Sequence, residues 1–356
     1  MARDVPWSEY QLIPGVPPNS REPALIAVGQ TLHLVYTNNR ILYHTWWQEQ
    51  TWTTPTRVAA GERASLAATA DNQLHCLFSN QFVGNYEIYY TFWDGVTWSL
   101  PQNVSHTRGA STRPVITVAP DGKLHAAWAD TTPGYSVIYH ATREEPFWNN
   151  APLPNGRGCF PAIAAMPNGD IYVAWQDRRS DTNRYDIFCS ILHNQTWSIP
   201  DFVSDCPSGH SIQPRLATST SGGCHIVWQE EEEGIYRVHH ADYRPGGWSI
   251  PTAVSTRGAD CRLPNIVASH QGYLQALWLE GQYLVHRVRS TAYDAPWLEP
   301  EVASDRCIGV TDFAMAITPA GQLHVVLCGL NEDGTRRLYH IQRQPALQHT
   351  AFIPIA

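Results

Sequence analysis

The chain has 356 residues, of which 43% are hydrophobic and 16% are charged, and its formal net charge is −8. This length is sufficient for one large core or two ordinary ones. The acidic balance and the lack of a basic run argue against a nucleic-acid partner. No apolar stretch approaches the roughly 18–20 residues that a membrane span needs. The first residues lack the apolar segment of a signal peptide, so we expect a cytoplasmic protein, or a secreted one if a leader has been removed.

A sequence repeat covers the chain from residue 23 onward. Each copy begins with an apolar run, usually led by proline, followed by a turn and Leu-His-apolar-apolar-Trp-x-acid. A loop, Ile-Tyr-Tyr/His and finally Trp-Ser-x-Pro complete it. The copies start near residues 23, 64, 114, 161, 214, 264 and 314, so they lie 41 to 53 residues apart. A fixed period of this length indicates a repeat architecture.

Each copy contains four short runs rich in β-branched and aromatic residues, separated by Gly, Asn, Asp or Pro turns. This pattern predicts four antiparallel strands. Seven copies of four strands predict an all-β fold, the seven-bladed β-propeller, in which blades pack face to face around a channel. We expect residues 1–356 to form a single domain and a monomer.

The tryptophans indicate how the ring closes. Six copies have a tryptophan at the start of their last strand: Trp52, Trp98, Trp148, Trp197, Trp248 and Trp297. The seventh copy ends at Leu338-Tyr339-His340 without one, whereas Pro6-Trp7-Ser8 stands at the other end of the chain. We therefore predict that residues 5–12 supply the outer strand of the last blade, which removes an open sheet edge.

Arginines and carboxylates are predicted to meet at one end of the channel. In a propeller, the loop that enters the first strand and the loop that follows the second strand open on the same face. The entry loops carry Arg21, Arg63, Arg113 and Arg262. The second strands end in Asp130, Asp177, Glu230 and Glu280, and Arg178 follows Asp177. Such a set can bind an anion and transfer a proton, or it can brace neighbouring blades through ion pairs.

The histidines divide into a repeated set and a remainder. Ten share two positions of the repeat: His33, His75, His125, His225, His324, and His44, His140, His240, His286, His340. Both positions lie inside predicted strands, so we expect hydrogen-bonded packing groups. His106 and His210 lie in or near entry loops, where they are candidate general bases.

Two segments carry a resemblance to a known family. Asp94-Gly-Val-Thr-Trp-Ser-Leu-Pro101 resembles the tail of a Ser-x-Asp-x-Gly-x-Thr-Trp box, and residues 171–179 with Thr196-Trp-Ser-Ile-Pro200 are similar to the repeats around such boxes. The chain therefore resembles the Asp-box (BNR-type) propellers related to the sialidase superfamily. The resemblance covers nearly the whole chain and implies the propeller fold.

The resemblance also implies a site. Sialidases bind a substrate carboxylate with three arginines, the first in an Arg-x-Pro motif, which Arg21-Glu22-Pro23 and Arg262-Leu263-Pro264 match. Their acid/base aspartate lies early in the chain, but the corresponding loop, Thr37-Asn-Asn-Arg40, has no carboxylate, which argues against true sialidase activity. For the nucleophile pair, Glu230 with Tyr135, Tyr185 or Tyr236 are the candidates.

No cofactor or metal is predicted. Lys123 is the only lysine, so a Gly-x-x-x-x-Gly-Lys phosphate loop is missing, and the eight cysteines form no CxxC pair. The acidic run at residues 230–233 is best interpreted as a solvated loop, with a calcium site as the alternative.

These observations favour a protein that binds an anionic or polyhydroxylated small molecule, such as a glycan, at the arginine/carboxylate end of the channel. As an enzyme it would be a glycoside hydrolase or a lyase, with arginine neutralising a carboxylate and a nearby His, Tyr or acid moving the proton. One alternative is an intracellular biosynthetic cyclase or lyase that uses an aromatic channel mouth. The other is a non-catalytic lectin or interaction scaffold with several equivalent pockets.

Overall fold

The computed structural model describes residues 7–179, 181–204, 206, 209–256, 258–304, 309–331 and 333–343. Strands, turns and loops account for all of them. Within these ranges we find no helix long and apolar enough to cross a membrane.

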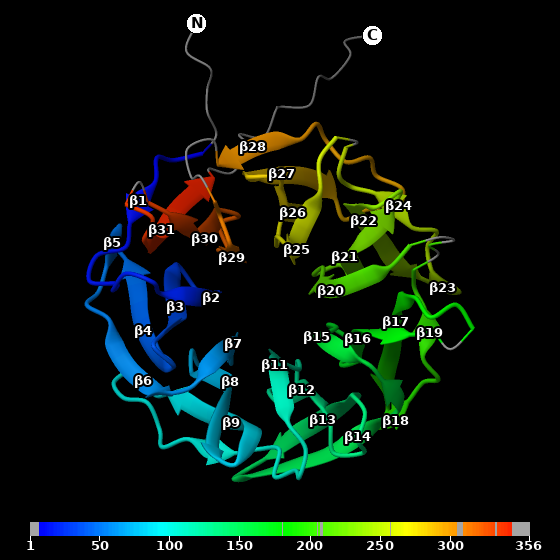
Figure 1. The fold of residues 1–356 in the computed structure, drawn as a ribbon, viewed down its shortest axis with the longest axis horizontal. Helices are drawn as coiled ribbons and strands as arrows, with labels where there is room; N and C mark the ends of the chain where they lie inside the picture. Colours follow the sequence, from blue (N-terminus) through cyan, green and yellow to red (C-terminus); the bar gives the residue numbers. More distant parts are fainter. Residues whose placement is uncertain are drawn as a thin grey trace, which may run out of the picture.

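The strands form seven antiparallel sheets arranged as blades around a central axis (Figure 1). Blade 1 contains β2 (Arg21–Val28), β3 (Thr31–Asn38), β4 (Ile41–Gln48) and β5 (Thr51–Trp52), with β6 (Thr56–Ala60) also paired to β4. Blade 2 contains β7 (Glu62–Ala68), β8 (Leu74–Val83), β9 (Asn85–Trp93) and β10 (Gln102–Asn103). Blade 3 contains β11 (Ser111–Val118), β12 (Leu124–Asp130), β13 (Val137–Glu144) and β14 (Phe147–Arg157).

The remaining blades repeat this order. Blade 4 contains β15 (Cys159–Ala165), β16 (Ile171–Arg178), β17 (Tyr185–His193) and β18 (Thr196–Trp197), with β19 (Asp201–Phe202) on β17. Blade 5 contains β20 (Ser211–Thr218), β21 (Cys224–Glu232), β22 (Ile235–Arg244) and β23 (Gly247–Trp248), with β24 (Thr252–Ala253) on β22. Blade 6 contains β25 (Cys261–Ala268), β26 (Tyr273–Glu280), β27 (Tyr283–Ser290) and β28 (Glu301–Ser304). Blade 7 contains β29 (Asp312–Ile317), β30 (Leu323–Leu330), β31 (Arg336–Arg343) and β1 (Gln11–Leu12). The predicted seven-bladed propeller is thereby confirmed.

The N-terminal segment closes the ring as predicted. Gln11 of β1 pairs with His340 of β31, and Leu12 pairs with Tyr339. The buried Trp7 forms a further bridge with Arg343 of β31. Residues 5 and 6 of the predicted closing segment lie outside the described residues. The last blade thus joins the two ends of the chain in one sheet.

The innermost strands begin two or three residues before the repeat starts near residues 23 to 314 that the sequence indicates, because a β-bulge lies at that point. In β2, pairing with β3 shifts between Arg21 and Ala24, and equivalent shifts occur in β7, β11, β15, β20 and β25. The bulge lets pairing continue past the proline, which is tolerated because the innermost strand is a sheet edge. The bulge residue has a positive φ in all six strands: Glu22, Arg63, Arg113, Phe160, Gln213 and Leu263.

The repeated histidines lie inside the blades, as predicted. Four blades contain a stacked pair joined by ring nitrogens 3.0 to 3.3 Å apart: His33–His44, His125–His140, His225–His240 and His324–His340. The second histidine of each pair meets a tryptophan of the next blade edge to face, at 5.0 to 5.5 Å between ring centroids. Because burial disfavours the charged form, the pKa of His225 is lowered to about 4. These neutral pairs therefore join adjacent blades.

Candidate functional site: an arginine-lined axial cavity

A cavity of about 730 Å³ lies on the propeller axis, at the end where the innermost strands begin. Residues from all seven innermost strands line it. Its charged residues are five arginines and two carboxylates: Arg21, Arg63, Arg113, Arg215, Arg336, Glu22 and Asp312. The cavity is therefore positive although the chain as a whole carries a net charge of −8.

The β-bulges determine which side chains line this cavity. All six bulge residues line it, including Arg113, whereas the residue before the bulge does so only in β2. Three of the bulge N–H groups are bound across a blade boundary: those of Gln213, Leu263 and Arg63 donate to Gln176, Gln229 and Glu22 of the preceding blade. These bonds satisfy a donor that the bulge removes from the ladder, and they fix the strand at the cavity wall.

Arg113 and Arg215 are half-buried arginines without an ionic partner among the described residues. The Arg113 guanidinium stacks on the Phe160 ring at 3.6 Å. Arg215 donates only to its neighbour's backbone, from Nη1 to the Pro214 carbonyl at 3.1 Å. Burial, and next the positive charge of Arg63, lower the pKa of Arg113 to about 10. Burial also lowers the pKa of Arg215, although the carboxylate of Asp312 opposes this. Both side chains remain cationic at neutral pH, with donors free for a ligand.

Asp312 and Glu22 are the two carboxylates of the cavity, and their environments differ. Burial raises the pKa of Asp312 to about 6, and the negative charge of Glu22 adds to this effect. The N–H of Phe313 donates to Asp312 at 2.9 Å. Glu22 accepts from Thr37 at 3.0 Å and lies 3.9 Å from the Nε of Arg63. Asp312 is therefore the group that can exchange a proton near neutral pH, while Glu22 is bound into the wall.

Some of the predicted arginines line the axial cavity and others do not. Arg21, Arg63 and Arg113 line the cavity together, and Arg21 is also 3.5 Å from Glu62. Arg262 precedes its bulge residue, does not line the cavity, and has a side chain that is 71% exposed and bound to Asp260 at 2.6 Å. Arg178 lines a separate cavity. Three of the predicted arginines, from different blades, do converge on the axis. The predicted Arg262 of blade 6 is not among them, whereas Arg215 of blade 5, which was not predicted, lines the cavity.

The four predicted carboxylates lie away from the axial cavity. Asp130 is fully buried and accepts from Thr107, Ser111 and the Thr132 N–H. Glu280 accepts from Trp278 at 3.0 Å and lines a hollow on blade 6. Asp177 lines the same separate cavity as Arg178, and burial raises its pKa. The physical reason is that the second strand lies one step outward from the axis, so its end faces the blade boundary.

The candidate bases also lie off the axis. His106 is exposed, and its backbone N–H donates to Asn103 at 3.2 Å. The Nδ1 atom of His210 accepts from the Tyr185 backbone N–H at 3.0 Å. The Tyr185 and His210 rings lie 5.7 Å apart. None of these three residues lines the axial cavity.

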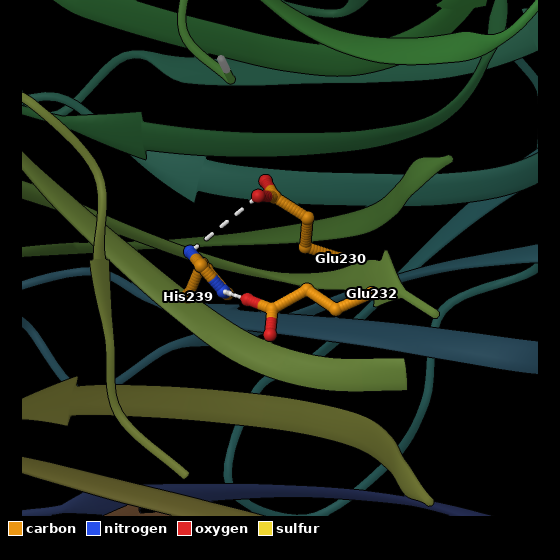
Figure 2. A group of neighbouring side chains, drawn as sticks. All are labelled: Glu230, Glu232 and His239. Atoms are coloured by element: carbon orange, nitrogen blue, oxygen red, sulfur yellow. Dashed lines mark hydrogen bonds and ion pairs between the residues drawn. The ribbon is translucent and has the colours of Figure 1, made fainter. Parts of the chain in front are cut away.

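Glu230, Glu232 and His239 are the one group of described side chains whose ligand atoms could surround a metal ion, all within 4.8 Å of one another. Figure 2 shows that the imidazole lies between the two carboxylates: Nε2 is 2.8 Å from Glu232, and Nδ1 is 3.6 Å from Glu230. Each carboxylate thus approaches a different ring nitrogen. Arg237 already occupies the second oxygen of Glu232, at 2.8 Å.

The expectation of a solvated loop at residues 230–233 is wrong for the first three residues. Glu230, Glu231 and Glu232 belong to β21, and Glu230 is buried, accepting from Trp228 at 2.8 Å. The pairing of β21 with β22 continues to Glu232, opposite Ile235, so the hairpin turn is shorter than the acidic run. The acidic side chains are satisfied by a histidine, an arginine and a tryptophan.

Sequence reasoning missed Arg215, Asp312 and Arg336. Arg215 occupies a position that carries a small, apolar or amide residue in the other blades, such as Ala24, Val115 or Asn265. An isolated charge at an innermost-strand position was the available signal. Asp312 stands one residue before the bulge position, where Arg21 and Arg262 stand in blades 1 and 6. Arg336 begins β31, and no repeat position marks it.

No protein-family model matches the chain, and no curated protein matches it. Solved structures do match. A polysaccharide lyase, an ulvan lyase, superposes with a TM-score of 0.66 at 10% identity, over 92% of this chain and 95% of that one. An α-L-arabinofuranosidase from Fusarium graminearum gives a TM-score of 0.53 at 10% identity, over 79% and 92% of the two chains. A protein of unknown function from Dyadobacter fermentans gives 0.57 at 15% identity, over 94% and 100%.

At these identities the likeness establishes the fold. The chain is a seven-bladed β-propeller whose structural neighbours include enzymes that process glycans. The Asp-box resemblance of the sequence stays a prediction.

Proposed function

We propose that the axial cavity binds an anionic oligosaccharide, with Arg113 and Arg215 contacting a carboxylate or sulfate group. The observation that carries the proposal is that these two half-buried guanidiniums have no carboxylate partner among the described residues. A cation removed from water without a partner lowers stability, so its retention is best explained by a ligand that supplies the missing charge. Arginine fits this role because its planar donors bind carboxylate and sulfate oxygens in pairs.

The neighbouring structures support a glycan as the ligand class. The ulvan lyase has also been solved bound to -[GlcA(1-4)Rha3S]-, a repeat that contains a uronate and a sulfate. A lectin with equivalent pockets is less well supported, because the six bulge positions carry different residues. A cyclase with an aromatic channel mouth is also less well supported, since Phe160 and Phe313 are the only aromatic residues among the described ones lining the cavity.

Catalysis is the second candidate function, and Asp312 favours it. A carboxyl group with a pKa near 6 can donate or accept a proton at neutral pH. In a lyase or hydrolase reaction the arginines would neutralise the substrate's anionic group while Asp312 moved the proton. If so, Asp312→Asn abolishes turnover while binding persists, and the wild-type rate shows a titration near pH 6. Loss of turnover only in parallel with loss of binding would contradict a proton-transfer role.

The binding proposal is tested by calorimetry with a heparin-derived disaccharide, which carries uronate and sulfate, and with neutral arabinobiose. We expect the wild type to bind the anionic sugar and not the neutral one. Arg113→Gln should weaken binding at least tenfold and leave the melting temperature unchanged or higher, because an unpaired cation has been removed from a half-buried site. The matched control is Arg57→Gln, which removes an exposed arginine of β6 at the outer rim of blade 1. Equal binding by Arg113→Gln and the wild type would overturn the proposal.

A further inference from the structure

A second cavity, of about 570 Å³, lies at the boundary between blades 3 and 4. Arg157 at the end of β14 lines it, with Asp177 and Arg178 at the end of β16. Phe188 of β17 and Phe202 of β19 form its apolar side. The cavity shares the end of the propeller at which the axial cavity lies, because Arg157 is separated from the start of β15 by Gly158 alone.

Two arginines of this second cavity are free of ion pairs within the described part of the chain. The guanidinium of Arg157 lies over the exposed Tyr135 ring at 5.2 Å. That of Arg178 lies 5.7 Å from the Tyr185 ring, and its Nε donates to the Asn183 carbonyl at 3.1 Å. The third arginine, at position 179, already binds both oxygens of Asp181, at 3.0 and 2.5 Å. The lining therefore sets three arginines against two carboxylates, Asp177 and Asp181, and its charge balance is positive.

The apolar side of the second cavity can support a sugar ring. Phe202 is 42% exposed, and its ring lies 5.7 Å from that of Phe188. The guanidinium of Arg179 covers Phe202 at 5.3 Å, which holds the ring in place. A partly exposed aromatic ring beside cations suits an acidic sugar, since the ring offers an apolar contact while the cations neutralise the anion.

The two cavities are separated by a short segment of blade 4. Phe160 lines the axial cavity and Arg157 lines the second one, so only two residues, Gly158 and Cys159, stand between them, and the three residue steps span at most about 11 Å. Gly158 holds this segment against β16: its φ is +136°, and a Cβ there would lie 2.4 Å from the Gln176 carbonyl oxygen. Burial raises the pKa of the Cys159 thiol in this segment; the charge of Arg113 opposes this effect and that of Asp177 adds to it.

We propose that the second cavity binds a further acidic sugar unit of the same chain whose first acidic unit is bound on the axis. The inference rests on the proposed function and defines its substrate class: an acidic oligo- or polysaccharide, bound across blade 4. Arg157 and Arg178 neutralise the second anionic group, and Phe202 stacks on its ring. Both ends of the ligand are then held by arginines that form no ion pair within the described residues.

The experiment measures the affinity for heparin-derived oligosaccharides of two, four, six and eight sugars. For the wild type, we expect affinity to rise at least tenfold between the shortest and the longest oligosaccharide. Arg157→Gln combined with Arg178→Gln should leave disaccharide affinity unchanged and abolish the rise with length. The control pair, Arg57→Gln with Lys123→Gln, removes the same charge elsewhere on the surface and should preserve the rise. If the double variant does not fold, Arg157→Gln alone should reduce the rise.

The outcomes separate the two proposals. If no oligosaccharide of any length binds, or if disaccharide binding does not depend on Arg113, the proposed function fails. If disaccharide binding depends on Arg113 but affinity does not rise with length, the axial site stands and the second site is overturned. A rise that both double variants preserve also overturns it. A rise that both double variants lose reflects general charge attraction and has the same consequence.

Discussion

The blades and the axis use charged and polar side chains in opposite ways. Inside the blades, the histidines recur at two positions. In four blades the two histidines are hydrogen-bonded to each other, and the second one also meets a tryptophan of the next blade. On the axis, the residue type at a given strand position varies from blade to blade, so the arginines do not recur around the ring. Arg113 and Arg215 have no carboxylate partner among the described residues. The repeated histidines are thus paired inside the blades, whereas Arg113 and Arg215 on the axis have no carboxylate within ion-pair distance among the described residues.

This difference distinguishes packing residues from ligand-binding residues within a single repeat protein. Every blade faces the same packing problem, so a residue that solves it recurs around the ring. A ligand on the axis is not seven-fold symmetric, so the residues that bind it need not recur. Departure from the repeat, combined with an unsatisfied charge, therefore indicates the site better than the repeat does.

The largest expected effect comes from opening the ring on which both regions depend. Deletion of residues 1–12 removes β1 and Trp7, which leaves the edge of β31 unpaired and the Trp7 site on blade 7 empty. We expect aggregation or a large fall in melting temperature, together with loss of sugar binding, because every blade contributes to the axial cavity. Size-exclusion chromatography and thermal unfolding check this. A monomeric variant of wild-type stability would contradict the closure.

The next effect concerns the histidine pairs. His225→Ala leaves the Nε2 atom of His240 without its partner in a fully buried position, and should lower the free energy of unfolding by about 1–3 kcal/mol. Chemical denaturation measures this. Blade 6 has Gln275 at the equivalent position, bound to His286 at 2.6 Å, so His225→Gln should recover part of the loss. Sugar affinity per folded molecule should be unchanged in both variants. A stable His225→Ala that had lost binding would show that the repeated set includes functional residues.

A smaller effect is the pH dependence of stability. Burial lowers the pKa of His33, His125, His225 and His324 from 6.5 to about 4. Between these values the unfolded chain binds more protons than the folded one, so stability falls as the pH decreases from 6.5 toward 4. Each such histidine contributes a slope of up to about 1.4 kcal/mol per pH unit. Unfolding measured at pH 7, 6 and 5 tests this, and His225→Gln should make the slope shallower.

The fold was predictable because packing repeats. Seven copies of the same four-strand pattern, and the unmatched Trp7 at the start of the chain, defined both the blade number and the closure. Strand starts were displaced by two or three residues, because prolines hide the bulge that precedes them. Nothing in residue identity marks that bulge, since its six residues range from Glu22 to Phe160.

The site was predictable only in part, for the same reason. Sequence reasoning placed arginines at the entry-loop end, and Arg21, Arg63 and Arg113 do line the axial cavity. It could not distinguish the bulge residue, which lines the axial cavity in all six bulged strands, from the residue before it, which does so only in β2. The acids that end the second strands followed the repeat closely, and Asp130 and Glu230 are accordingly buried and satisfied.

The smallest expected effect is at Arg262, where the sequence motif and the structure assign different roles to the same residue. The Arg-x-Pro motif gives Arg21 and Arg262 the same role, whereas the bulge places Leu263, not Arg262, at the cavity wall. Arg262→Lys keeps the charge beside Asp260 on an exposed surface, where such a pair contributes about 0–1 kcal/mol. Melting temperature and affinity for the heparin disaccharide should therefore both equal the wild-type values. Arg113→Lys keeps its charge too, but loses the paired donors, and should weaken binding roughly tenfold. If both lysine variants weaken binding equally, the motif identifies the ligand-binding arginines and the bulge does not. If only Arg113→Lys does, one residue of register in the innermost strand separates a ligand-binding arginine from a surface one.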